Sequence, residues 1–182
     1  MRKFTHYFSD TGPAYIKFTQ KMTLPVLNLP PVSAPVRRDE DSRRGGMEIY
    51  DRLRCKWVAL TPEEWVRQHF VEFLMSEREF PQALMANEVA LTLNSTARRC
   101  DTLIYTRALK PLCVVEYKRP DVAVSAKVFD QIARYNGVLN APFLIVSNGL
   151  RHYCARYTAS GYIFLRDIPS YDAMIAACNQ NI

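Results

Sequence analysis

The sequence predicts an α/β domain built on a mixed β-sheet. Apolar residues recur with a helical period after residue 61 and again along residues 124–139. Three strand-like segments lie between these two helices, and a short apolar strand follows the second helix. The order helix, three strands, helix, strand is typical of an α/β domain in which helices flank a central mixed sheet.

The first helix is expected to begin at a capping box formed by residues 61–64, Thr-Pro-Glu-Glu. Thr61 takes the N-cap position, proline the first helical position and Glu64 the third. A capping role for Glu64 is therefore favoured over a catalytic one, and Glu63 is an ordinary acidic residue of a first turn. The residues that recur at helical spacing and would face a core are Val66, Phe70, Phe73 and Leu74.

Strands follow this helix in a regular order. Residues 88–93 alternate with a period of two, and residues 101–106 and 112–118 form a plausible hairpin around a turn at 107–111. The second helix has Ser125 as its candidate N-cap. The remaining expected elements are a strand at 143–147 that ends at a turn, added strands at 153–157 and 162–165, and a closing helix at 170–179.

The N-terminal residues differ from the rest in proline content and charge. Five of the 11 prolines fall between positions 13 and 35, which predicts an extended, flexible arm over residues 1–46 and a folded domain over 47–182. Residues 1–56 carry 11 Lys or Arg and 6 Asp or Glu, a net charge of +5, whereas residues 57–182 carry 13 and 12, a net of +1. A basic arm could contact phosphates, and a merely solvated tail explains the charge equally well.

Composition excludes several classes of protein. A chain of 182 residues with 48% hydrophobic residues can bury one core, and its apolar runs are too short to span a bilayer. No apolar segment follows the first basic residues, so a signal peptide is not expected. The five cysteines are scattered without a C-x-x-C pair, which favours reduced thiols in a cytoplasmic protein over a disulfide scaffold or a zinc cluster.

Charged residues end the apolar strand at 112–118. Glu116 and Lys118 point to the same side because side chains alternate along a strand. Asp101 lies at the start of the partner strand in the hairpin, so it should approach Glu116. Glu88, at the start of the first strand, is a third carboxylate that could reach this place. Taken alone, Glu116 and Lys118 are best interpreted as a structural ion pair.

Carboxylates that converge in this way require a cation. Two of them a few ångströms apart repel, and one would take up a proton unless a positive ion lies between them. Carboxylate oxygens suit Mg²⁺, which keeps water ligands and accepts phosphate oxygens. Lys118 could orient a metal-bound water or stabilise charge that develops on a phosphate. The sequence therefore points to a Mg²⁺ site, with Mn²⁺ able to substitute.

These residues resemble the motif of the PD-(D/E)XK nuclease superfamily, an acid followed after a variable gap by acid-x-Lys. Asp101 and residues 116–118 (Glu-Tyr-Lys) match it, and Cys100 replaces the proline of the superfamily's name. Gln131 and Tyr135 match the Q-x-x-x-Y element of its RecB-like branch. The wider text between about residues 48 and 168 looks like the N-terminal nuclease domain of type I restriction enzyme R subunits, which small stand-alone proteins also carry.

The resemblance implies a restriction-endonuclease-like core and a role for each matching residue. Asp101 and Glu116 would bind the metal with the Tyr117 carbonyl, and Lys118 would position the attacking water. Glu88 would be an outer or second-metal ligand. Gln131 would orient the site or touch the substrate backbone, and Tyr135, on an apolar helix face, would brace the helix.

The expected function is therefore that of a metal-dependent endonuclease that acts on DNA in restriction-modification. R subunits couple this domain to a helicase motor, but no G-x-x-x-x-G-K-[ST] loop occurs here, so a motor would act in trans or cleavage would need no ATP. Other restriction subunits are expected partners, and double-strand cleavage would favour a homodimer. Two alternatives stay open, a non-catalytic nucleic-acid-binding module and a regulatory subunit that binds a cation for stability.

Overall fold

A six-stranded mixed sheet forms the centre of the molecule in the computed structural model, which describes residues 15–17, 23–39, 46–93 and 96–180. Its strands follow the order β11-β10-β9-β8-β7-β6. Neighbouring strands are antiparallel except β8 and β9, which are parallel and are joined through α2. The elements of this sheet are β6 (Met85–Leu93), β7 (Thr96–Tyr105), β8 (Pro111–Tyr117), β9 (Phe143–Ser147), β10 (His152–Thr158) and β11 (Gly161–Leu165).

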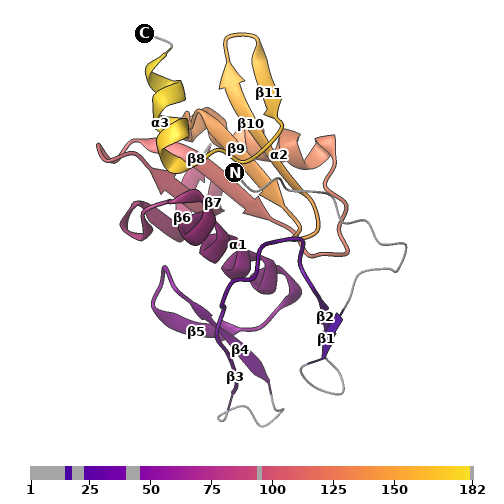
Figure 1. Cartoon of the computed structure of the whole chain (residues 1–182). Helices are drawn as coiled ribbons and strands as arrows, with labels where there is room; N and C mark the ends of the chain where they lie inside the picture. The colour runs from indigo at the N-terminus through magenta and orange to yellow at the C-terminus, as the bar shows by residue number, and fades with distance from the viewer. Residues whose placement is uncertain (1–14, 18–22, 40–45, 94–95, 181–182) are drawn as a thin grey trace.

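Helices cover both faces of the sheet. The helix α1 (Pro62–Arg78) packs on one face, where Phe70 and Tyr117 meet edge to face with ring centroids 5.8 Å apart. The helix α2 (Ala126–Leu139) covers the other face and buries Ile132 with Val114 and Leu144. The closing helix α3 is Tyr171–Asn179. Figure 1 shows α1 crossing in front of the sheet, and the predicted mixed α/β class is confirmed.

The helix α1 starts as its sequence predicts. The Thr61 side chain accepts a hydrogen bond from the backbone N–H of Glu64 at 3.0 Å, which satisfies one of the free amide groups of the first turn. Glu79 ends the helix in the left-handed conformation. This start fixes the position of Glu63 and Glu64 relative to the sheet.

A second sheet of three strands lies beyond α1. It consists of β3 (Val36–Arg38), β4 (Met47–Asp51) and β5 (Lys56–Ala59), all antiparallel. Figure 1 shows it below α1, in the opposite direction from α3. The sequence pattern did not indicate these strands, and their position matters because the turn after β4 reaches toward the site described below.

Part of the expected N-terminal arm packs against the domain. A short hairpin pairs β1 (Tyr15–Lys17) with β2 (Thr23–Pro25). Leu24 and Leu27 are buried in the same core as α1. Residues 1–14, 18–22 and 40–45 of the arm lie outside the described residues, and the domain boundary at residue 46 stays a prediction.

Two strand starts differ from the expected ones. β6 begins at Met85 rather than Glu88, and β7 begins at Thr96, so Asp101 lies in the middle of its strand. The reason is the pairing of β6 with β7, which runs from Met85 opposite Ile104 to Leu93 opposite Thr96. Main-chain hydrogen bonds between β6 and β7 continue beyond the residues in which apolar and polar side chains alternate, so both strands are longer than that pattern indicates.

All five cysteines belong to the described residues, and their thiols are free. Cys100, Cys113 and Cys154 are buried, Cys178 is half-buried, and Cys55 is exposed. Within the described part of the chain, no helix is long and apolar enough to cross a membrane.

Candidate active site

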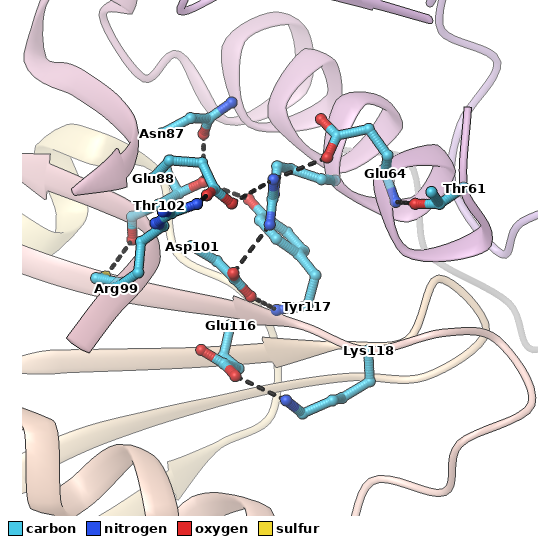
Figure 2. Close-up of polar contacts among 12 residues, drawn as sticks. Thr61, Glu64, Asn87, Glu88, Arg99, Asp101, Thr102, Glu116, Tyr117 and Lys118 are labelled. Carbon is cyan, nitrogen blue, oxygen red and sulfur yellow. Dashed lines mark hydrogen bonds and ion pairs between the residues drawn. The ribbon is translucent and has the colours of Figure 1, made fainter. Parts of the chain in front are cut away.

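The site lies where β7 and β8 separate. The two strands pair up to Thr102 opposite Val115, and the same register places Asp101 opposite Glu116. At this point the Asp101 side chain takes the place of a main-chain partner, because its Oδ2 accepts the backbone N–H of Tyr117 at 2.8 Å (Figure 2). The predicted hairpin thus brings the two carboxylates together from positions 15 residues apart.

Glu116 and Lys118 form the second part of the site. The Lys118 ammonium donates to Glu116 Oε1 at 2.7 Å, as the alternation of the strand predicts (Figure 2). Burial and the nearby Asp101 carboxylate raise the pKa of Glu116 well above its usual range. Burial lowers the pKa of Lys118, but the hydrogen bond and charge of Glu116 outweigh this and raise it, so Lys118 carries its charge at neutral pH.

Arg67 of α1 connects the acids on the other side of Asp101. Its Nη2 donates to Asp101 Oδ1 at 2.9 Å, while Nη1 lies 2.7 Å from Glu88 Oε1 and 2.8 Å from Glu64 Oε2. The Arg67 side chain is only 5% exposed. Burial lowers its pKa, but Asp101, Glu64 and Glu88 outweigh this and raise it, so the guanidinium is a permanent cation in the site.

Glu88 faces arginines on two sides. Besides Arg67, Arg99 approaches it with Nη1 2.5 Å from Glu88 Oε2. Burial raises the pKa of Glu88, but the bond from Arg99 and the charge of Arg67 outweigh this and lower it. The backbone of Glu88 has a φ of 57°, in the left-handed region that few non-glycine residues adopt. Glu88 therefore reaches the site, but the Arg67 guanidinium lies between its carboxylate and that of Asp101.

A chain of buried hydrogen bonds supports the strands of the site. Asn87 donates to both carboxylate oxygens of Asp51 at 3.1 Å, and Thr102 donates to Asn87 Oδ1 at 2.6 Å. The Thr102 hydroxyl lies 3.1 Å from the Tyr117 hydroxyl, which then is the donor in that pair. This chain links β4, β6, β7 and β8, so it holds in place the backbone that carries Asp101 and Glu116.

Glu63 also belongs to this neighbourhood. Burial and the Asp101 carboxylate raise its pKa, whereas Lys118 and Arg67 lower it, which places Glu63 within electrostatic reach of all three. The sequence suggested only an ordinary residue of a first turn. The cap by Thr61 is confirmed, but the Glu64 side chain, which was expected to cap the helix, accepts hydrogen bonds from Arg67 and Gln68 instead.

The predicted residues of α2 cannot be placed in the same way. Gln131 and Tyr135 lie within that helix, but their side chains are outside the described residues. Their predicted roles, like that of the Tyr117 carbonyl, stay predictions.

The donor set suits one hard cation at Asp101 and Glu116. Both side chains offer carboxylate oxygens, and Mg²⁺ is commonly held by one or two carboxylates together with water. Among the described residues, Lys118 is the one hydrogen-bond partner of the Glu116 side chain. Within the same residues, no group of three or more His, Cys, Asp or Glu side chains is arranged to hold a metal ion. The site therefore fits a Mg²⁺ ion whose protein ligands include the two carboxylates and whose remaining positions are filled by water.

The family model of the type I restriction enzyme R protein N terminus matches residues 62–169, which is more than half of the chain. This chain belongs to that family. The matched segment begins at the first residue of α1 and contains Asp101, Glu116, Lys118, Glu88 and Arg67, whereas Asp51 precedes it. The family predicted from the sequence motifs is thereby confirmed.

A solved structure shows the same fold as this R protein N-terminal domain. It is the fragment structure of a putative HsdR subunit of a type I restriction enzyme from Vibrio vulnificus YJ016, with a TM-score of 0.52 and 19% sequence identity. The match covers 67% of this chain and 26% of that one, so the chain spans about a quarter of the solved relative's length. Among curated proteins there is no match.

Proposed function

We propose that the chain is a Mg²⁺-dependent endonuclease that hydrolyses phosphodiester bonds of DNA, with Mn²⁺ able to replace Mg²⁺. The observation that carries this proposal is the meeting of Asp101, Glu116 and Lys118 where β7 and β8 separate. A structural ion pair explains Glu116 and Lys118 alone, whereas Asp101, which pairs with Arg67, brings a second carboxylate to the same place from the neighbouring strand. Membership in a restriction enzyme family supports the same conclusion.

Each residue has a part in this reaction. Asp101 and Glu116 would hold the ion together with the Tyr117 carbonyl, and a Mg²⁺ bound there would polarise a phosphate oxygen and acidify a water. Lys118 is protonated, so it acts as a donor that orients the attacking water or stabilises charge on the phosphate, and not as a base. Gln131 would orient the site or touch the substrate backbone, as the family motif implies, and Glu88 acts on Asp101 through Arg67.

A hollow that could receive substrate is lined by residues next to the site in the chain. It has a volume of about 410 Å³ and is lined by Pro62, which precedes Glu63, by Arg119, which follows Lys118, and by residues 23–25 of the arm. Arg119 is exposed and held by Asp121, so its guanidinium can turn to a phosphate.

DNA is the proposed substrate. Other subunits of a type I restriction system, or a separate motor protein, are the proposed partners in the cytoplasm. A homodimer would supply one site for each DNA strand.

The test incubates plasmid and linear DNA with the chain and Mg²⁺ or Mn²⁺. We expect the wild type to cleave, and Asp101→Asn and Lys118→Ala to lower the rate by about 10²-fold or more, because each removes a group that stabilises the transition state. Lys110→Ala is the matched control, since Lys110 is an exposed lysine of the β7–β8 turn and should keep its activity.

The result also separates the alternatives. Cleavage that survives both substitutions would show that the site is elsewhere. DNA binding by the wild type without cleavage would favour the non-catalytic module. The ion pairs of Glu88 with Arg67 and Arg99 are compatible with that alternative, because they leave one carboxylate fewer to bind a metal. Melting that depends on the metal without any affinity for DNA would favour the regulatory subunit.

A further inference from the structure

An arginine fills the space between the first two strands of the site. The β6–β7 register pairs Asn87 with Thr102 and Val89 with Cys100, so Glu88 and Asp101 lie opposite each other. The guanidinium of Arg67 lies between their carboxylates. Its Nη1 is 2.7 Å from Glu88 Oε1 and its Nη2 is 2.9 Å from Asp101 Oδ1. Its plane also lies over the Tyr117 ring, with 5.7 Å from Cζ to the ring centroid.

The carboxylates on this side of Asp101 already have cationic partners. Arg67 reaches Glu64, Glu88 and Asp101, and Arg99 binds Glu88. Arg54, which binds Asp51 at 2.5 Å, also lies 3.5 Å from Glu64. A divalent ion added here would meet compensated carboxylates and a fixed positive charge, which repels it.

The other side of Asp101 has an excess of negative charge. Glu116 pairs with Lys118, and Glu63 lies within electrostatic reach of Lys118 and, more weakly, of Arg67. Because Asp101 joins both sides, a divalent ion gains most where it meets Asp101 and Glu116 and keeps away from Arg67. A divalent cation is therefore favoured on the Glu116 side of Asp101 and disfavoured on the Glu88 side.

We propose that the Arg67 guanidinium stands where a second divalent ion would bridge Glu88 and Asp101, so that each chain binds one divalent ion, at Asp101 and Glu116. This inference rests on the proposed function, which supplies the first ion. Two-metal sites hold ions about 3.5–4 Å apart. Asp101 would be the shared ligand of such a pair, and its Oδ1 is bound by Arg67 instead.

The test counts Mn²⁺ ions bound to the full chain in the absence of DNA, by electron paramagnetic resonance of free Mn²⁺ or by calorimetry. We expect one ion per wild-type chain. Glu116→Gln should lower the affinity about tenfold or more, because it removes a ligand charge. Glu88→Gln should keep the stoichiometry and change the affinity by less than about threefold, since Arg67 and not the ion occupies this carboxylate.

Arg67→Met removes the charge and keeps most of the packing on Tyr117. The variant should bind a second Mn²⁺, for a total of two. Arg99→Met is the matched control, because Arg99 also binds Glu88 but is 68% exposed and does not touch Asp101. That variant should still bind one ion. If Arg67→Met does not fold, Glu88→Gln decides the question in a chain that keeps Arg67.

The outcomes separate this inference from the function on which it rests. Two ions in the wild type, or a clear loss of affinity in Glu88→Gln, overturns the inference while the metal-dependent site stands. A folded Arg67→Met variant that binds only one ion overturns it as well. A wild type that binds no Mn²⁺ overturns both the inference and the proposed function.

Discussion

Glu116 is a carboxylate whose surroundings favour its neutral form. Burial and the Asp101 carboxylate raise its pKa to about 7, even though Lys118 opposes the shift. A pKa that is higher in the folded chain than in the unfolded chain means that folding binds the proton more tightly. The stability that this proton contributes is complete below the unfolded pKa and is lost as the pH rises through the folded pKa.

Glu116→Gln should therefore stabilise the metal-free chain at about pH 8 by on the order of 1–3 kcal/mol relative to the wild type. At about pH 4 the two should differ much less, because the carboxyl is then protonated in the folded chain and largely so in the unfolded one. Urea unfolding at both pH values in the presence of a chelator measures the difference. Equal differences at the two pH values would contradict this account.

Single residues of the site differ in how far the sequence reveals them. Asp101, Glu116 and Lys118 could be found because alternation and hairpin pairing are local rules. Arg67 could not be found, because its partners Glu88 and Asp101 are 21 and 34 residues away in the chain. A charged residue in an amphipathic helix is usually solvated, and only the packing of α1 on the sheet shows that this one is buried.

At the scale of the elements, the two long helices begin differently. The Thr61 side chain caps α1 with a 3.0 Å hydrogen bond, whereas Ser125, the N-cap residue of α2, makes no such side-chain bond. Thr61→Ala should lower the free energy of unfolding by about 1 kcal/mol, and Ser125→Ala should cost clearly less. Urea unfolding of both variants measures this. Equal losses would mean that the Thr61 hydroxyl does not stabilise α1.

The same capped start carries Glu63 and Glu64, so the cap also orders the edge of the site. The Thr61→Ala variant should lose part of its cleavage activity under conditions in which it is still folded. Ser125→Ala serves as the control for this measurement too. Cleavage rates for Thr61→Ala that match those of the wild type would show that the first turn does not depend on its cap.

Strong periodicity revealed some elements, and weak turn signals hid others. The pattern predicted α1 and β9 closely, because an amphipathic helix with a capping box and a buried apolar strand have few alternatives. β4 and β5 were missed for a physical reason. Their turn contains no Gly, Pro or Asn, and Cys55 takes the left-handed conformation at a φ of 51° instead.

At the scale of the whole molecule, the arm and the domain are held together by specific contacts. The Trp65 indole N–H donates to the Pro25 carbonyl at 3.1 Å, and the backbone N–H of Asn28 donates to the Gly149 carbonyl at 2.8 Å. Gly149 has a φ of +80°, and a Cβ there would lie 2.6 Å from Leu27. A side chain here would strain the backbone and push the Leu27 side chain aside, so glycine suits the close approach of the turn to the arm.

These contacts explain why the conformation of the arm was only partly predictable from the sequence. Proline content and charge describe how a segment behaves by itself, and both predicted an extended conformation. The burial of Leu24 and Leu27 depends on a surface formed by α1 and by the turn between β9 and β10, which no local pattern shows. The boundary predicted at residue 46 thus has to be tested by changing the arm itself.

Leu24→Ala should lower the free energy of unfolding by about 2–5 kcal/mol, because it removes a buried side chain and leaves a cavity. Leu24 is 3% exposed, whereas Val26, two residues on, is 46% exposed, so Val26→Ala should change stability by less than about 0.5 kcal/mol. Urea unfolding of the two variants provides the comparison. Equal and small effects would mean that the arm is independent of the domain. A large effect of Leu24→Ala alone would make residues 23–28 part of the folded unit that supports α1, so that removing residues 1–46 should weaken both folding and cleavage.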